Sequence, residues 1–339
     1  MRIGDLDYEL PPELIAQHPL ERRDEARLLV LDRKSGKLEH SRFYKLEQHL
    51  RDGDLLVIND TRVFPARLIA RKETGGSVEL LLVRPIPHPE GAWLALIRAH
   101  RALKDGSRLT LPDGSELKLV GYERPGRAII VSDDARALSA IAERAGTLAL
   151  PHYIRRSPAE EDSDAYQTVY AAKTGAIAAP TAGLHFTPEL LKRLAEHGIR
   201  SAALTLHIGP GTFIPIRGAE VEAHSMEAEW YTIPPGAVRA LEHCHRIAGR
   251  VIAVGTSSVR ALESYAVTGD VEGFTGLFIH PGFRFKLCDA MITNFHMPRS
   301  TVLALVMAFA GREPVLNAYR EAIRRRYRFL SYGDAMLIL

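Results

Sequence analysis

The chain has 339 residues, of which 46% are hydrophobic and 25% are charged, and its formal net charge is +3. This composition is typical of a globular protein with room for two domains, and so small a charge neither requires nor excludes a nucleic-acid partner. No apolar run reaches the ~18 residues of a membrane span, the first residues lack a secretory signal and the two cysteines form no framework, so we expect a cytoplasmic protein with no membrane partner.

The first predicted strand of the main domain covers residues 54–58 and ends in a polar loop. This loop contains Asn59, Asp60, Thr61 and Arg62. Polar loops also follow the apolar runs of the second half of the chain. We therefore expect the early loop to lie at the same edge of a sheet as the later ones.

Residues 66–131 have a different pattern, in which short apolar runs alternate with turns and no helical period is seen. The segment Pro112-Asp113-Gly114 is a strong hairpin signal. Six closely spaced strands without intervening helices predict a small antiparallel β-barrel. A helix over about residues 134–144 is expected after it.

The second half of the chain repeats a unit of apolar run, polar loop and helix. In the first unit, a run at residues 176–179 leads into the loop 180–186. Thr187 is then a suitable N-cap, Pro188 a suitable first helical residue and Gly198 a stop signal. We predict a strand, a loop and a helix in that order.

Three further units follow the same plan. Their predicted strands cover residues 199–206, 250–254 and 290–293, and Ser300 is a suitable N-cap for the helix that follows the last of them. Alternation of strands with helices is typical of a parallel sheet, which binds ligands beyond the carboxyl ends of its strands. The polar residues expected at that edge are His185, His207, Thr256, Ser257, Asn294 and His296.

These patterns together predict an α/β main domain with an open or barrel-like, largely parallel sheet, interrupted by the antiparallel barrel. We place the main domain at residues 1–64 and 151–339 and the inserted barrel at residues 65–150. The molecule is expected to be a monomer.

Familiar cofactor motifs are not satisfied. Gly209 and Gly211 have the spacing of the first two glycines of a dinucleotide fingerprint, but Ile214 stands at the third position, and no Walker motif occurs. On a helix His243 and His245 would point about 200° apart, so a shared metal is not expected. We predict no metal site and no bound cofactor.

Two basic clusters are compatible either with phosphate contacts or with solvated basic faces. One lies near residue 100 and the other near residue 325. Their members are Arg98, Arg101, Lys104, Arg324, Arg325 and Arg328.

Short segments along the whole chain match those of a known enzyme family, in the same order. The matching segments are Leu10–Gln17, Ile58–Val63, Tyr166–Tyr170, Ala179–Phe186, Leu206–Gly209, Val254–Arg260, Thr293–Pro298 and Tyr332–Met336. The chain closely resembles the S-adenosylmethionine:tRNA ribosyltransferase-isomerases of queuosine biosynthesis. One position departs from that family, which commonly has a histidine where this chain has Glu227.

The resemblance implies an enzyme that transfers the ribosyl part of S-adenosylmethionine to 7-aminomethyl-7-deazaguanine at the wobble position of tRNA and isomerises it. Epoxyqueuosine-tRNA, adenine and methionine are the implied products. S-adenosylmethionine is therefore a consumed substrate, and the expected partner is tRNA that carries the modified base.

This chemistry suggests roles for the predicted site. A base is needed at the carbon next to the sulfonium, and fixed donors are needed where an oxygen gains negative charge. The catalytic candidates are His185, His207, His296, Asp60 and Glu227, and the sequence leaves open which is the base. If the segment 224–230 is extended, Glu227 and Glu229 face the same side, either as an acid/base pair or as an exposed edge. The candidates for substrate binding are Asn59, Thr61, Arg62, Arg67, Tyr170, Thr181, Gly183, Phe186, Gly209, Gly211, Thr212, Phe213, Thr256, Ser257, Arg260 and Asn294.

Two alternatives belong to other function classes. An S-adenosylmethionine-dependent RNA methyltransferase is disfavoured by the missing glycine fingerprint, and its product would be S-adenosylhomocysteine. A non-catalytic RNA-binding protein is disfavoured by the many titratable groups at predicted strand ends.

Overall fold

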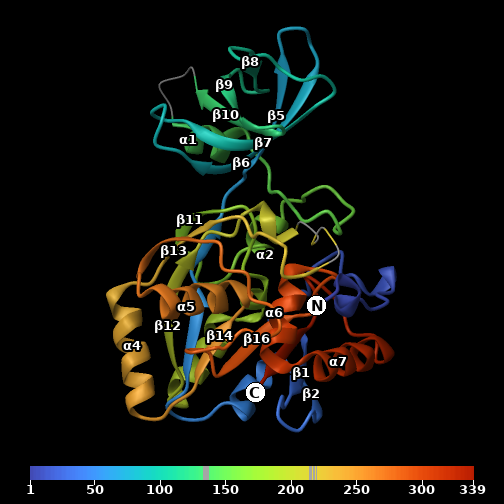
Figure 1. Cartoon of the computed structure of the whole chain (residues 1–339), viewed down its shortest axis with the longest axis vertical. Helices are drawn as coiled ribbons and strands as arrows, with labels where there is room; N and C mark the ends of the chain where they lie inside the picture. The colour runs from blue at the N-terminus through green and yellow to red at the C-terminus, as the bar shows by residue number, and fades with distance from the viewer. Residues whose placement is uncertain (133–136, 214–215, 217, 219) are drawn as a thin grey trace.

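The computed structural model of the chain describes residues 1–132, 137–213, 216, 218 and 220–339. It contains a large α/β domain and a smaller β-barrel that lies beyond one end of it (Figure 1). Among the described residues, no single helix is long and apolar enough to span a membrane. The helices α6 (Thr301–Ala310) and α7 (Arg312–Arg324) meet that test only as a pair bent by 114°.

The large domain is built on a nine-stranded mixed sheet. Its strands, in spatial order, are β15 (Glu272–Thr275), β13 (Glu229–Thr232), β12 (Arg200–Leu206), β3 (Leu55–Asn59), β14 (Val251–Val254), β16 (Ala290–Asn294), β17 (Ala335–Ile338), β1 (Arg27–Leu31) and β2 (Leu38–Arg42). The central strands β12, β3, β14 and β16 are parallel, and β17 is parallel to β1. The remaining pairs are antiparallel.

Helices cover both faces of this sheet. They are α3 (Pro188–Glu196), α4 (Pro235–Arg246), α5 (Thr256–Thr268), α6 (Thr301–Ala310) and α7 (Arg312–Arg324), with short 3₁₀ helices η1 (Ile3–Leu6), η2 (Pro12–Leu14), η3 (Arg23–Glu25), η4 (Phe43–His49), η5 (Thr181–His185) and η6 (Pro210–Phe213). Alternate residues of β3 face opposite ways. Leu55 and Val57 pack in the core that contains α4 to α7, whereas Leu56 and Ile58 pack with α3 and η4. All five residues of β3 are buried, as expected for a strand covered on both faces.

The predicted helix ends are confirmed at two positions. The Oγ1 atom of Thr187 accepts a hydrogen bond from the N–H of Leu190 at 3.1 Å and caps α3. The Oγ atom of Ser300 accepts one from Leu303 at 3.2 Å and caps α6. These side chains satisfy donors that the first helical turn leaves unpaired.

The barrel is closed and antiparallel, as predicted. In spatial order its strands are β10 (Arg127–Ser132), β7 (Trp93–Ala99), β6 (Ser77–Pro85), β5 (Arg67–Lys72), β8 (Arg108–Thr110) and β9 (Glu116–Arg124). Helix α1 (Leu138–Ala145) packs Leu138, Ile141 and Ala142 into the barrel core. The expected start of this helix near residue 134 lies outside the described residues.

The strand predicted at residues 176–179 is wrong. The observed strand β11 (Lys173–Ala176) ends where the predicted one begins, and it pairs only with β4 (Thr61–Val63). The apolar character of the next residues has another cause, because each enters a different core. Ile177 packs in the barrel, Ala178 with α4 to α7, and Ala179 near Tyr332.

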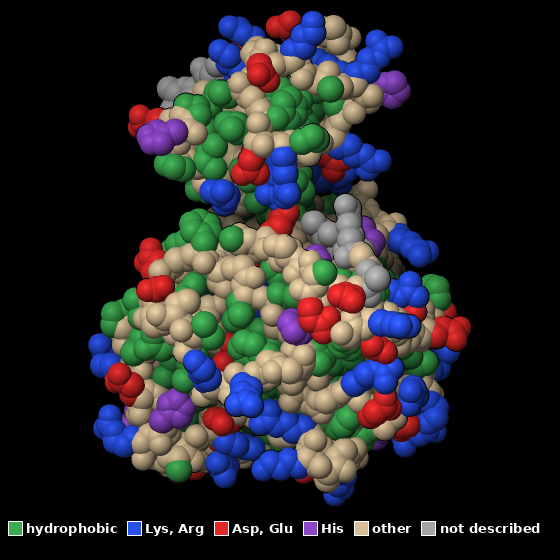
Figure 2. Space-filling view, viewed as in Figure 1, with side chains coloured by type: hydrophobic (Ala, Val, Ile, Leu, Met, Phe, Trp, Pro, Cys, Tyr) green, Lys and Arg blue, Asp and Glu red, His purple; other side chains and the backbone are tan. Residues whose placement is uncertain are grey.

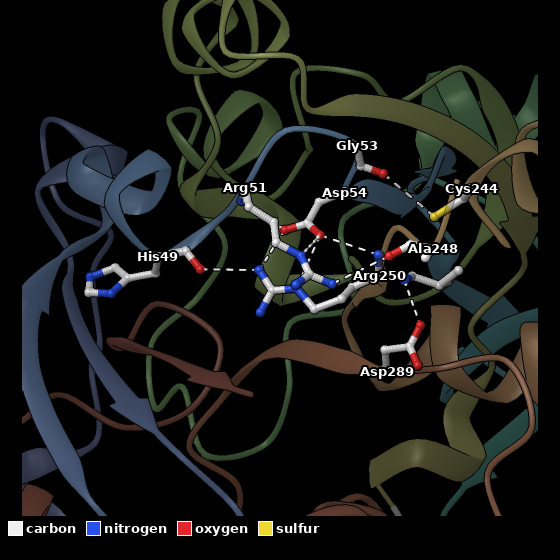
Figure 3. Close-up of polar contacts among 9 residues, drawn as sticks. His49, Arg51, Gly53, Asp54, Cys244, Ala248, Arg250 and Asp289 are labelled. Atoms are coloured by element: carbon white, nitrogen blue, oxygen red, sulfur yellow. Dashed lines mark hydrogen bonds and ion pairs between the residues drawn. The ribbon is translucent and has the colours of Figure 1, made fainter. Parts of the chain in front are cut away.

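A partly buried ion pair lies at the amino-terminal edge of the central strands (Figure 3). Asp54 immediately precedes β3, and Arg250 immediately precedes β14. The Arg250 guanidinium donates to the Asp54 carboxylate at 2.6 and 3.0 Å, and the Arg51 N–H donates to it at 2.9 Å. The Cys244 thiol donates to the Gly53 carbonyl at 3.7 Å beside this pair. This edge is therefore fixed by polar contacts between elements distant in sequence.

Candidate functional site

A cavity lies at the carboxyl ends of β14 and β16. It is lined by the start of η5, the first turn of α5, the loop after β16 and the first turns of α6. Six of the predicted site residues line it, and these are Thr181, Thr256, Ser257, Arg260, Asn294 and His296. Segments far apart in the sequence thus meet at one place, as expected from the carboxyl edge of a parallel sheet.

Asn294 is held rigidly at the cavity wall. Its Nδ2 donates to His185 Nε2 and to the carbonyl of Leu330, both at 3.2 Å, and its Oδ1 accepts from Thr181 Oγ1 at 3.1 Å. Both N–H groups of the amide are therefore used inside the protein. Asn294 consequently orients its neighbours and has no donor left for a substrate.

His185 lies behind Asn294 and is not among the residues that line the cavity. Its side chain is buried, and its ring packs 5.0 Å from the ring of Phe43. Burial lowers the pKa of His185 to about 4, because the imidazolium would lose its hydration. At neutral pH His185 is a neutral hydrogen-bond acceptor for Asn294.

His296 is the one catalytic candidate that lines the cavity among the described residues. Its Nε2 lies 2.7 Å from Thr293 Oγ1, and its backbone N–H donates to the Tyr319 hydroxyl at 3.0 Å. Burial lowers the pKa of His296 to about 4 as well. The ring is therefore unprotonated at neutral pH, which is the form a general base needs.

His207 belongs to a second group, beside the cavity. Its Nδ1 lies 2.8 Å from Thr61 Oγ1, and its ring stacks on Trp230 with centroids 5.0 Å apart. Burial lowers the pKa of His207, and the nearby Asp60 opposes this effect. Gly175 allows the close approach, since a Cβ there would lie 2.6 Å from the imidazole.

Asp60 and Asn59 are held by the neighbouring strand. Asp60 Oδ1 accepts from Thr205 Oγ1 at 2.5 Å. Asn59 exchanges hydrogen bonds with the backbone of Leu206 and donates to Ser257 Oγ at 3.1 Å. Neither Asn59 nor Asp60 lines the cavity. Asn59 is linked to the cavity wall by its hydrogen bond to Ser257, which does line the cavity.

Glu229 lines the cavity, whereas the sequence alone leaves it either in an acid/base pair with Glu227 or on an exposed edge. It ion-pairs with Arg260, and both side chains are buried, with 5% and 7% exposed. Its Oε1 also accepts from the N–H of Gly209 at 2.7 Å. Glu227 lies two residues before β13 and contacts Arg124 and Arg127 of the barrel.

The remaining substrate-binding candidates are dispersed. Tyr170 and Phe186 pack in the core that contains α3 and η4, with Tyr170 beside Gly183. Arg67 donates to Glu79 at 2.7 Å on the barrel. Arg62 is exposed on β4. Gly209 and Gly211 line a separate cleft below the barrel. The side chains of Thr212 and Phe213 lie outside the described part of the structure.

The two basic clusters differ in their environment. Figure 2 shows Lys and Arg side chains at the far end of the barrel and along the lower edge of the main domain. Arg98, Arg101 and Lys104 are exposed on the barrel. Arg324 and Arg325 both donate to Glu321, and Arg328 is partly buried and donates to the His18 carbonyl.

Comparisons with known proteins agree with this architecture. The family model described as queuosine biosynthesis protein matches residues 3–338. An S-adenosylmethionine:tRNA ribosyltransferase-isomerase of Anaeromyxobacter sp. (strain Fw109-5) is 51% identical over all of this chain and 99% of its own. One of Thermotoga maritima is 48% identical over all of both chains.

A solved structure is similar as well. The crystal structure of S-adenosylmethionine tRNA ribosyltransferase from Thermotoga maritima has a TM-score of 0.57 and 39% identity, covering 99% of this chain and 100% of that one. The family model spans nearly the whole sequence, and the relatives match along their full lengths. The chain therefore belongs to the queuosine biosynthesis protein family.

Proposed function

We propose that the chain is an S-adenosylmethionine:tRNA ribosyltransferase-isomerase. It transfers the ribosyl part of S-adenosylmethionine to 7-aminomethyl-7-deazaguanine at the tRNA wobble position and isomerises it, releasing adenine and methionine. The observation that carries this proposal is the convergence of Thr181, Thr256, Arg260 and His296 on one cavity in a chain of this family.

The first turn of α5 suits the charge that develops in this reaction. Thr256 and Ser257 line the cavity, and Gly255 precedes them with a φ of 88°. The N–H groups that begin a helix are unpaired within it and carry partial positive charge. They favour an anionic group there, either a substrate carboxylate or an oxygen that gains charge as the ring rearranges.

We assign the general base to His296. It lines the cavity and is held by Thr293. The candidates His185, His207 and Asp60 do not line the cavity, and Glu227 is paired with arginines. Its task is to remove a proton from the carbon next to the sulfonium. His185 and Asn294 then act as positioning residues.

Partners and requirements follow from the same proposal. The substrates are S-adenosylmethionine, which is consumed, and tRNA with the modified base, and the reaction uses no metal or bound cofactor. Among the described residues no three His, Cys, Asp or Glu side chains are grouped to hold a metal ion. We propose a cytoplasmic monomer, and light scattering coupled to size exclusion tests its mass.

Product analysis tests the function. Incubation with S-adenosylmethionine and the modified tRNA should release adenine and methionine in equal amounts and leave epoxyqueuosine on the tRNA, with or without a metal chelator. His296→Gln should lose nearly all of this release, while His245→Gln, an exposed change on α4, should not. Formation of S-adenosylhomocysteine would establish a methyltransferase instead, and tRNA binding without any product would establish a binding protein.

A further inference from the structure

A second cavity separates the barrel from the main domain, and we call it the interdomain cleft. Val83, Arg84, Arg124 and Arg127 line it from the barrel, and Gly209, Pro210, Gly211, Glu227, Ala228, Glu229 and Phe274 line it from the main domain. Figure 2 shows that the molecule narrows here and that acidic and basic side chains meet across the waist.

The barrel side of the cleft is strongly basic. Arg84, Arg124 and Arg127 come from the ends of three different strands, β6, β9 and β10. The Glu227 carboxylate pairs with two of them, because it accepts hydrogen bonds from Arg124 at 3.2 Å and from Arg127. Glu123 also pairs with Arg127 at 3.7 Å, so among the described residues two carboxylates pair with this group of three guanidinium groups. The group keeps one positive charge in excess, which leaves the cleft able to accept further negative charge.

The main-domain side presents an exposed aromatic ring. Phe274 is 57% exposed and lies on β15, the edge strand of the large sheet. The Arg84 guanidinium lies 5.5 Å from the centre of this ring. Exposed aromatic rings beside arginines are typical of surfaces that bind unpaired nucleotides, since bases stack on the ring and phosphates contact the cations.

The cleft also adjoins the candidate active site. Glu229 lines both the cleft and the cavity, with one carboxylate oxygen bound to Gly209 and the other to Arg260. A strand seated in the cleft would therefore have its next nucleotide beside the cavity. This arrangement suits an enzyme that must bring one nucleotide of a loop to its site.

We propose that the interdomain cleft binds the unpaired anticodon-loop nucleotides next to the wobble base. Phe274 stacks on a base, and Arg84, Arg124 and Arg127 contact phosphates. The phosphates replace Glu227, which holds Arg124 and Arg127 in the free protein. This inference rests on the proposed function, because it takes the tRNA substrate as the ligand.

Equilibrium binding of the full-length protein to the modified tRNA tests the inference, measured at several salt concentrations. Phe274→Ala should weaken binding by about 5- to 150-fold, as expected for a lost stacking contact. Arg84→Gln should weaken binding and lower the salt dependence by about one released ion. The matched controls are Val267→Ala, an exposed change on α5, and Arg71→Gln, an exposed change on β5, and both should bind as the unchanged protein does.

Glu227→Gln separates RNA binding from a merely structural link between domains. It should tighten tRNA binding severalfold, because it removes a charge that competes with phosphate. A purely structural role of Glu227 predicts unchanged or weaker binding.

Near-unchanged binding by Phe274→Ala and Arg84→Gln would overturn the inference. Product formation by the unchanged protein would leave the proposed function standing in that case. Conversely, loss of binding in the cleft variants without any adenine release by the unchanged protein would support the cleft and remove the proposed activity.

Discussion

The pH dependence of the reaction provides a sharp test of the assignment of His296. Burial lowers the pKa of His296 to about 4. A general base must be unprotonated, so a lowered pKa extends its activity toward acid. At pH 5 about 90% of such an imidazole is unprotonated, whereas an ordinary histidine with a pKa of about 6.5 would be only about 3% unprotonated. The two cases differ about 30-fold in available base.

Single-turnover adenine release between pH 5 and 8, with both substrates saturating, measures this difference. The aminomethyl group of the tRNA also titrates, so each rate is divided by that of His296→Gln at the same pH, which cancels the shared effect. The ratio should be about 100 to 10,000, the usual contribution of a general base, and should stay constant within about twofold. His245→Gln is the control and should give the rate of the unchanged protein.

Two results would refute the reasoning. A ratio that falls about 30-fold between pH 8 and pH 5 would mean that the imidazole titrates normally and that burial does not control it. A His296→Gln rate near that of the unchanged protein at pH 7 would remove His296 from the proton transfer altogether.

Three further predictions concern stability. Asp54→Asn should lower the free energy of unfolding by about 2–4 kcal/mol in urea titrations because it leaves the Arg250 charge without its partner, yet adenine release at 25 °C should persist; an unchanged unfolding midpoint would contradict this. Burial raises the pKa of Asp162, but hydrogen bonds from Arg156 and other donors outweigh it and hold the pKa at about 2, below the ordinary 3.8. The resulting stabilisation of about 2 kcal/mol should be complete above pH 4 and disappear as pH falls toward 2, and Asp162→Asn should lack this dependence in acid-unfolding curves. Gly183→Ala should cost about 1–3 kcal/mol because the new methyl group would clash with the Tyr170 hydroxyl, and Tyr170→Phe should restore part of the lost melting temperature, whereas equal melting temperatures for the single and double variants would argue against the clash.

The elements predicted correctly are those whose signals are local. The caps at Thr187 and Ser300 lie within three residues of the donors that they satisfy, and the barrel strands alternate with turns at short spacing. The antiparallel flanks of the large sheet were not predicted. β13, β15 and β17 have four residues each, and their pairing depends on strands far away in the sequence.

The difference between local signals and distant contacts also explains which features of the site could be predicted. Asn294 ends β16, and Thr256 and His296 each come two residues after the end of a strand, so local order placed them at the right edge of the sheet. The burial of His185 depends on Phe43, more than a hundred residues earlier, and no local pattern reports that contact. The pairing of Glu229 with Arg260 likewise needs an antiparallel strand and a helix to meet.

The two ends of the central strands differ in how their polar groups are used. At the amino-terminal end, Asp54 and Arg250 pair with each other and tie β3 to β14 (Figure 3). At the carboxyl end, the strands instead lead into loops whose polar groups surround a cavity. β3 has five residues and β14 has four, and these strands connect the two ends. Unfolding measurements report on the first end, and adenine release reports on the second. A variant that changes both together would show that the strands transmit strain, and the persistence of adenine release in Asp54→Asn decides this point.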